Sequence, residues 1–317
     1  MELRHLRSLV ALADHDFSVS RAADQLHLVQ PAVSQHLKQL ETEVGARLLV
    51  RQGKRLTGLT EVGEQVLDYA RQALSSSESI LAAGRDHIEE NTGTLRIATT
   101  HTQACYVLPP VIRRFVATYP AVNLQINQGT PGQLVDAAVN DAVDLAICTE
   151  ALAEHPALDA IPCYRWNRCV IAPPQHPILR KRRLTLTDLC KYPIITYVFG
   201  FTGRGHFSDT FAKADLNPTV VLSAADTDVI KTYVREGLGI GVIARLAYQP
   251  GRDDDLGMRD LSHLFPWAIT KVAYRRNKYL RKFARDFIDF FQAETGGGDA
   301  DRVIEPCRPR RADGRGA

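Results

Sequence analysis

The hydrophobic pattern changes character near residue 93, and this change limits the possible folds more than any other feature. Before it, apolar residues recur at helical spacing with few strand signals. After it, strand-like runs at 94–99, 122–127 and 143–148 alternate with helical runs at 108–119 and 131–140. Such alternation is typical of α/β architecture with a largely parallel sheet. We therefore expect an all-α N-terminal module followed by an α/β region.

Composition and charge narrow the class of protein. Of the 317 residues, 45% are hydrophobic and 24% are charged, and these ordinary globular values exclude wholesale disorder. The first residues turn charged and amphipathic at once, without the apolar segment of a secretion signal, so we expect a cytoplasmic protein. The longest apolar runs, such as 237–244, fall far short of the roughly 20 residues of a membrane span.

Three helices in the first 41 residues have the arrangement of a helix-turn-helix. Small Ala22 and Ala23 allow close packing of the second helix, which Ser18 is predicted to cap. The third helix begins near Gln30, with Pro31 in its first turn. Its polar side, rich in Gln, Ser and Lys, suits base edges and phosphates in the major groove. Spacing alone equally allows an ordinary solvated face.

A basic turn follows the third helix, between two short extended pieces centred on Gly53. The turn is either a wing that binds phosphate or a solvated charge cluster, and its position after a helix-turn-helix favours the wing. The residues predicted to contact DNA are Ser18, Arg21, Gln30, Pro31, Ser34, Gln35, Lys38, Arg51, Lys54 and Arg55.

A long helix is predicted from Glu61 onward, capped by Thr60. Leucine or isoleucine recurs in it every seven residues, and small residues fill the other seam positions, as in a closely packed two-helix coiled coil. The alternative is a helix that packs on its own domain, but we favour dimerisation. The predicted seam residues are Leu67, Leu74, Leu81 and Ile88.

Polar side chains follow several strands of the α/β region. Thr100, Thr102 and Gln103 come after one strand and just before a helix, where hydroxyls, an amide and backbone N–H groups could bind an anion. Thr149 follows a second apolar strand, and Thr202 lies in a glycine-containing loop. Ligands of open α/β sheets bind outside the carboxyl ends of strands. Each threonine could instead bond its own backbone.

Residues 1–90 resemble the DNA-binding region of the LysR-type transcriptional regulators. The matching segments are FSVSRAADQL at 17–26, QPAVSQHLKQLE at 30–41, EVG at 43–45, LLVR at 48–51 and LTEVG at 59–63. One departure is Val29, where the family usually has Ser before Gln-Pro. The resemblance implies a winged helix-turn-helix that binds double-stranded promoter DNA as a homodimer, with pairing of dimers into a homotetramer.

Residues 93–295 resemble the effector-binding region of the same family, a two-lobed fold similar to periplasmic binding proteins. The segments IATTHTQA at 97–104, TEAL at 149–152, PCYRWNR at 162–168, TYVFGFTGR at 196–204 and DTDVIKTYVR at 226–235 narrow the match. They resemble the CysB/Cbl-like subgroup, regulators of cysteine biosynthesis and sulfur assimilation. One departure is Cys105, where the subgroup typically has Arg after Gln-Ala.

The subgroup resemblance implies a small anionic effector, which is acetylserine or a sulfate-like anion such as sulfate or thiosulfate. The implied effector site comprises Thr100, Thr102, Gln103, Thr149 and Thr202, with Trp166 nearby. Trp166 either supplies its indole N–H or packs in the core.

The predicted domains follow from these assignments. They are a winged helix-turn-helix at 1–60, a dimerisation helix at 61–92, a first effector lobe at 93–162 and 267–295, a second lobe at 163–266, and a disordered tail at 296–317.

We expect neither catalysis nor a cofactor, because no general acid, base or nucleophile converges on the threonine loops. Among the ten histidines we find no His-x-x-x-His pair and take none to pair with a cysteine at ligand spacing, so we predict no metal. The alternatives to control of sulfur assimilation are regulation of sulfonate or other sulfur-source use, or of an unrelated pathway. A solute-binding protein is opposed by the helix-turn-helix.

Overall fold

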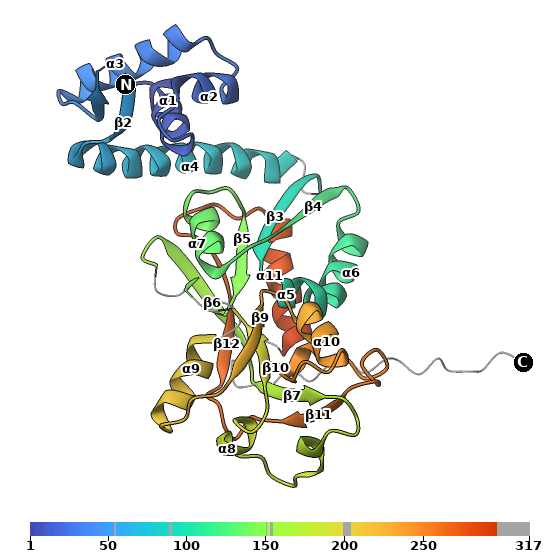
Figure 1. Cartoon of the computed structure of the whole chain (residues 1–317). Helices are drawn as coiled ribbons and strands as arrows, with labels where there is room; N and C mark the ends of the chain where they lie inside the picture. Colours follow the sequence, from blue (N-terminus) through green and yellow to red (C-terminus); the bar gives the residue numbers. More distant parts are fainter. Residues whose placement is uncertain (54, 89–90, 150, 153–154, 199–203, 297–317) are drawn as a thin grey trace, which may run out of the picture. The chain divides into compact units, whose positions relative to one another are not determined.

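The computed structural model describes residues 1–53, 55–88, 91–149, 151–152, 155–198 and 204–296 (Figure 1). The chain divides into two compact units. One comprises Met1–Ile88 together with Asn277–Arg281, and the other comprises Glu89–Arg276 and the residues from Lys282 onward.

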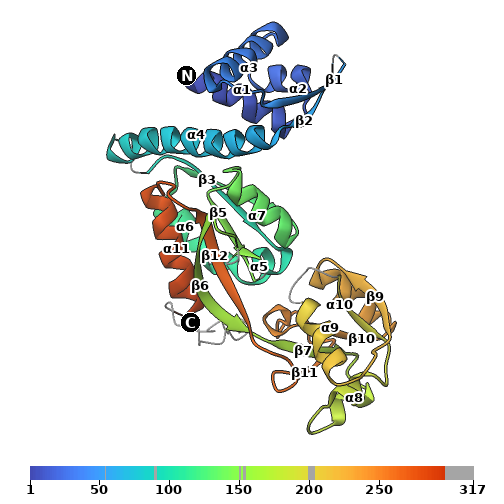
Figure 2. The same cartoon turned by 90° about the vertical axis from the view of Figure 1, so that its left-hand side faces the viewer.

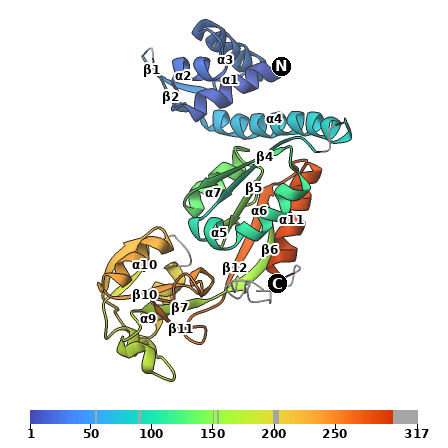
Figure 3. The same ribbon diagram turned by 90° about the vertical axis from the view of Figure 1, so that its right-hand side faces the viewer.

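The first unit is helical apart from one hairpin. Its elements are α1 (Leu3–Asp14), α2 (Val19–Gln25), α3 (Gln30–Val44), β1 (Leu49–Gln52), β2 (Arg55–Leu59) and α4 (Glu61–Ile88). Leu9, Leu12 and Leu40 are fully buried in its core, which α1, α3 and α4 share. Figure 3 shows the antiparallel hairpin of β1 and β2 beside α2 and α3.

The turns of this unit follow the sequence signals. The backbone reverses at Asp16 and Phe17, which both have positive φ angles, and Ser18 then caps α2 by accepting a hydrogen bond from the Arg21 N–H. Thr60 caps α4 through its hydroxyl, which accepts from the Gly63 N–H at 3.0 Å. These polar caps confirm the predicted starts of both helices.

Helix α4 does not present the predicted heptad as one exposed seam. Leu67 and Leu74 pack against the core of their own unit, whereas Leu81 is 55% exposed. Among the side chains described on α4, the most exposed apolar ones are instead Tyr69 and Ile80, at 68% and 74%. A seven-residue repeat drifts around a straight helix, so the repeat alone does not show which neighbour each position meets.

The first lobe of the second unit is built on a five-stranded sheet. Its strand order is β4 (Val122–Gln128), β3 (Gly93–Thr99), β5 (Leu145–Cys148), β12 (Ala268–Arg275) and β6 (Leu158–Trp166). Its helices are α5 (His101–Tyr106), α6 (Leu108–Thr118), α7 (Pro131–Val139) and α11 (Lys282–Thr295). Helix α7 covers one face of the sheet, and α6 and α11 lie together on the other (Figures 2 and 3).

The second lobe has a sheet of the same size. Its strand order is β11 (Gly257–Asp260), β7 (Arg168–Ala172), β10 (Ile240–Ala244), β8 (Ile194–Tyr197) and β9 (Val220–Ala224). The remaining elements of this lobe are η2 (Pro177–Arg180), α8 (Leu186–Leu189), α9 (Arg204–Lys213), α10 (Thr227–Arg235) and η3 (Arg245–Ala247). Phe207, Phe211 and Phe265 form an aromatic cluster in its core.

Both sheets are mixed, which corrects the expectation of a largely parallel sheet. In the first, β3 is parallel to β4 and β5, but β12 runs antiparallel to β5 and β6. In the second, β8 is parallel to β9 and β10, but β7 runs antiparallel to β10 and β11. Strand direction depends on how the chain returns, which a strand's own residues do not encode.

The chain passes twice between the lobes, and Asn167 marks the first passage from β6 to β7. Its side chain donates to the Phe265 carbonyl on the second passage and accepts from the Arg168 N–H. The sequence predicts the lobe boundary after residue 162, but β6 stays paired with β12 as far as Trp166, which lies opposite Ala268.

No described helix is long and apolar enough to cross a membrane.

Candidate functional site

The outer face of α3 carries the side chains predicted to read DNA. Val33, Leu37 and Leu40 are buried on the opposite face and hold the helix against the core. At 100° per residue, the five positions of α3 predicted to contact DNA fall within an arc of about 140°. All five are exposed: Gln30, Pro31, Ser34, Gln35 and Lys38. A continuous polar face of this kind suits a helix that enters the major groove.

The hairpin supplies cations beside this helix. Arg51 and Arg55 are exposed near its turn, while Leu56 faces the core. Ser18, Arg21 and Arg55 line one hollow on the surface. The Arg21 guanidinium donates to Asp16 at 3.1 Å, so a phosphate would compete with this exposed carboxylate. Lys54 lies outside the described residues.

Val29 leaves α3 without the cap that a serine could give. It occupies the N-cap position with no side-chain hydrogen bond to the helix, and it is 68% exposed. Pro31 in the first turn partly offsets this loss, because it lacks an N–H that would need a partner.

The predicted effector residues lie at one edge of the first lobe's sheet. Thr100, Thr102 and Gln103 follow β3, and Thr149 follows the parallel neighbour β5. Thr100, Thr102 and Gln103 are each at most 5% exposed. The helix behind the first loop, α5, has only six residues, so its dipole is short and the side chains must supply most of the donors.

A chain of hydrogen bonds links two of these side chains, Gln103 and Thr149, to three residues of the neighbouring strands. Tyr164 donates to the Gln103 carbonyl oxygen at 2.5 Å, and the Gln103 amide donates to the Thr270 hydroxyl at 3.3 Å. The Thr270 and Thr149 hydroxyls lie 3.2 Å apart, and the Trp166 indole N–H donates to Thr149 at 3.1 Å. Burial raises the pKa of Tyr164, so its hydroxyl stays protonated and orients the Gln103 amide.

The network leaves one hydroxyl hydrogen unused. The Thr270 hydroxyl accepts from the Gln103 amide, and the Thr149 hydroxyl accepts from the Trp166 indole N–H. Each of these two hydroxyls carries one hydrogen, and the hydrogen bond between them uses only one of the two. Thr102 is 2% exposed, and its hydroxyl has no hydrogen-bond partner among the described residues. A buried hydroxyl without a partner costs free energy unless a ligand supplies one. The arrangement can therefore bind an acceptor-rich anion.

Sequence reasoning missed two members of the network, Tyr164 and Thr270. Tyr164 and Trp166 alternate along β6 and so share one face, and Thr270 pairs with Tyr164 across the sheet. The spacing of the two aromatic residues was a visible signal, but the register that adds Thr270 was not. Thr202 lies outside the described residues.

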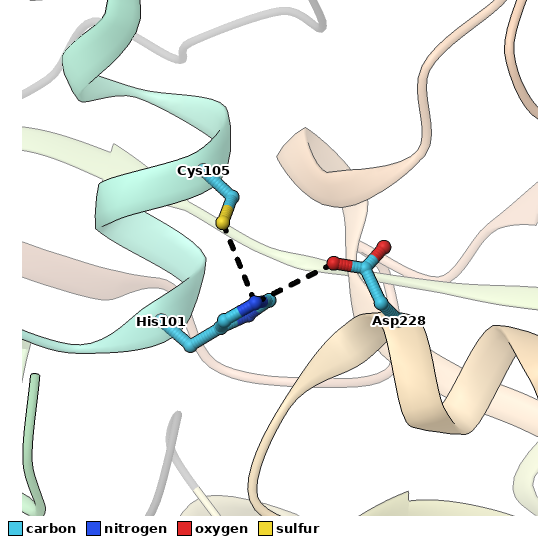
Figure 4. A group of neighbouring side chains, drawn as sticks. All are labelled: His101, Cys105 and Asp228. Carbon is cyan, nitrogen blue, oxygen red and sulfur yellow. Dashed lines mark hydrogen bonds and ion pairs between the residues drawn. The ribbon is translucent and has the colours of Figure 1, made fainter.

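Sequence reasoning also overlooked a histidine–cysteine pair. His101 and Cys105 are four residues apart on α5, and Asp228 of α10 approaches the same place (Figure 4). The prediction that no such pair has ligand spacing was wrong, because one helical turn brings positions i and i+4 to the same face.

Two known families match the chain. Residues 3–64 match the family "Bacterial regulatory helix-turn-helix protein, lysR family", and residues 89–296 match "LysR substrate binding domain". These matches span the helix-turn-helix with its hairpin and both effector lobes. They are families of regulators and not of enzymes.

Individual relatives extend over most of the chain. The transcriptional regulator CysB of Haemophilus influenzae is 42% identical over 92% of this chain and 90% of its own length. The regulator SsuR of Burkholderia cenocepacia is 42% identical over 92% and 94%. The crystal structure of the cofactor-binding domain of the Cbl regulator is 39% identical with a TM-score of 0.62, covering 64% of this chain and 90% of that one. The chain therefore belongs to the LysR family of bacterial DNA-binding transcriptional regulators.

Proposed function

We propose that this regulator controls genes of sulfur assimilation and cysteine biosynthesis in response to a small anionic effector. The observation that carries the proposal is the Thr102 hydroxyl, which is buried and has no hydrogen-bond partner among the described residues. The next residue, Gln103, belongs to a hydrogen-bonded network with Thr270 and Thr149. The similarity to CysB, SsuR and Cbl supports the assignment to sulfur metabolism. The working location is the cytoplasm, where the promoter lies.

The DNA contact falls to two groups of side chains. Gln30, Ser34, Gln35 and Lys38 read the major groove together with Pro31, while Ser18, Arg21, Arg51, Lys54 and Arg55 bind phosphate. The first group lies on the exposed face of α3, which suits contact with base edges. The second group is mostly cationic, and cations bind the phosphate backbone of any sequence.

Variants of α3 and the hairpin separate base reading from phosphate binding. With an operator selected from random DNA, Gln35→Ala should cost about 1–3 kcal/mol and relax the preference at one base position. Arg51→Ala should weaken all sequences alike and reduce the salt dependence by about one ion. Equal loss of specific and random binding in Gln35→Ala would remove its base-reading role.

The effector site offers neutral donors rather than cations. Thr100, Thr102, Gln103 and Thr149 provide hydroxyl or amide hydrogens at the sheet edge, with Thr202 as the fifth member and Trp166 orienting Thr149. Each hydrogen bond to a charged ligand contributes about 1.5–3 kcal/mol. A compact oxyanion, or the carboxylate of a small polar molecule, fits this chemistry.

A thermal-shift panel identifies the effector. The panel contains O- and N-acetylserine, sulfate, thiosulfate and alkyl sulfonates, since two relatives with different names match equally well. A true effector at a hundred times its dissociation constant adds about 2.7 kcal/mol to stability. Stabilisation by sulfonates alone would select the alternative of sulfonate use, and no stabilisation by any member would contradict a sulfur-linked anion.

Regulation would act through the arrangement of the lobes. The effector binds one arrangement more tightly and thereby shifts the population toward it, which changes the setting of paired DNA-binding units. This mechanism requires at least a homodimer, and a homotetramer is the assembly we propose. The seam lies on α4, where the exposed Tyr69 and Ile80 share a face.

A further inference from the structure

One group of side chains joins the two lobes and has no role in the proposed effector site. His101 and Cys105 lie one turn apart on α5 of the first lobe, and Asp228 lies in the first turn of α10 of the second (Figure 4). The His101 Nε2 atom is 3.4 Å from the Cys105 Sγ and 3.5 Å from the Asp228 Oδ2. The three atoms all lie within 4.8 Å of one another.

The pattern of contacts excludes a catalytic relay. A Cys–His–Asp relay uses both ring nitrogens, one for the thiol and the other for the carboxylate. Here the thiol and the carboxylate approach the same nitrogen, Nε2, as Figure 4 shows. The His101 Nδ1 has no partner among the described residues, so these two contacts decide the direction of the ring. Convergence of three ligand atoms suits a shared cation.

The distances agree with a tetrahedral zinc ion. Bonds of about 2.0–2.1 Å to nitrogen, 2.3 Å to sulfur and 2.0–2.2 Å to oxygen place the ligand atoms about 3.4–3.6 Å apart. The measured N–S and N–O separations of 3.4 and 3.5 Å match two of these edges. The Asp228 side chain is 59% exposed, so a small rotation can close the third edge.

Neighbouring groups orient the carboxylate and set the local charge. The Tyr106 hydroxyl donates to the Asp228 Oδ1 at 2.6 Å, which leaves Oδ2 for a metal, and Lys231 donates to Tyr106 in turn. Outer partners of this kind hold metal ligands in place. Burial and the nearby Asp228 and Asp226 raise the pKa of Cys105. The same carboxylates attract a divalent cation.

We infer that His101, Cys105 and Asp228 bind one zinc ion that fastens α5 to α10, with a fourth position open to water. Nitrogen and thiolate ligands favour zinc over magnesium or calcium. The site is independent of the proposed effector, although His101 lies between Thr100 and Thr102. The site also gives Cys105 a role. The CysB/Cbl-like subgroup typically has arginine at this position, and an arginine side chain cannot bind a metal.

Cobalt(II) is the probe, because a thiolate ligand gives it a charge-transfer band in the near ultraviolet. The full-length protein should bind one Co²⁺ per chain with this band, and Zn²⁺ should abolish it. Cys105→Ser should lose the band and bind at least about tenfold more weakly, and Asp228→Asn should keep the band with weaker binding. Cys190→Ser is the matched control, since Cys190 is a partly exposed cysteine of the second lobe, and it should behave as the wild type.

Three results would overturn the inference. They are the absence of the band at saturating Co²⁺, its survival in Cys105→Ser, and its loss in Cys190→Ser. Circular dichroism of each variant separates loss of the site from loss of the fold. Effector affinity enters none of these readouts, so failure of the proposed function leaves the test intact.

Discussion

Two threonines three residues apart, Thr99 and Thr102, use their hydroxyls in different ways. Thr99 is fully buried and donates to the Ile147 carbonyl at 2.9 Å, which ties β3 to β5. Thr102 is also buried, but its hydroxyl has no partner among the described residues. The same chemical group therefore supports the sheet at one position and remains available to a ligand at the other.

Replacing each threonine by valine separates these roles. Thr102→Val removes a hydroxyl that bonds no other described residue, so stability should hold or rise while effector affinity falls by roughly ten- to a hundredfold. Thr99→Val should lose about 1 kcal/mol of stability and bind effector as before. Urea unfolding and calorimetry measure the two quantities, and wild-type affinity in Thr102→Val would remove this residue from the site.

We expect His36 on α3 to make the first unit less stable in acid. Its Nδ1 lies 2.8 Å from the Ser8 hydroxyl, and its ring lies 5.5 Å from that of His5. Burial, followed by the charges of His5 and Arg4, lowers the pKa of His36 below its ordinary 6.5. The unfolded chain therefore binds this proton more readily than the folded one, so stability increases with pH.

The free energy of unfolding should therefore be unaffected by His36 above about pH 6.5. It should fall as the pH decreases from there toward the lowered pKa of His36 in the folded state. His36→Gln removes the titrating ring, so its stability should depend less on pH than that of the wild type between about pH 5 and pH 8. Urea unfolding across this range gives the two slopes, and identical slopes would exclude His36 as the source.

At the scale of elements, local signals predict the helices and strands of the first lobe well. Predicted runs at 94–99, 108–119 and 131–140 correspond to Gly93–Thr99, Leu108–Thr118 and Pro131–Val139. Helix α7 (Pro131–Val139) begins with a capping box between Thr130 and Gln133, a signal carried by four adjacent residues. Such boundaries are predictable because their causes are local.

Helix α4 shows where a periodic pattern stops being informative. The heptad is present, yet Leu67 and Leu74 pack within their own unit. Val62, Tyr69 and Ile80 lie at nearly the same angle around the helix, within about 20° at 100° per residue. They are 43%, 68% and 74% exposed. These three exposed apolar side chains therefore lie on a different face of α4 from the heptad positions.

The dimer should respond to this exposed face. Ile80→Asp places a carboxylate in the proposed seam and should give monomers at low concentration with little change in thermal stability. Leu74→Asp should instead lower the stability of the unit itself, since its side chain contacts the core. Light scattering combined with thermal unfolding distinguishes the two, and a dimer that persists in Ile80→Asp would place the seam elsewhere.

At the scale of the whole molecule, the candidate site combines segments that are far apart in the sequence. Gln103 bonds Thr270 across 167 positions and Tyr164 across 61. The strand-end rule predicts that Thr100, Thr102 and Thr149 meet at one edge of a sheet. It cannot supply Thr270, because an antiparallel strand from the end of the chain must first pair in the correct register.

We propose that one molecule couples an anion at the threonine network to DNA at α3. Coupling between two binding sites is reciprocal, so operator DNA must change effector affinity by the factor by which effector changes DNA affinity. Calorimetric titration of the effector from the panel, with and without the selected operator, measures this factor directly. We predict unequal effector affinities whose ratio equals the ratio of operator affinities with and without effector. Equal effector affinities in both titrations, together with unchanged operator binding, would contradict the account.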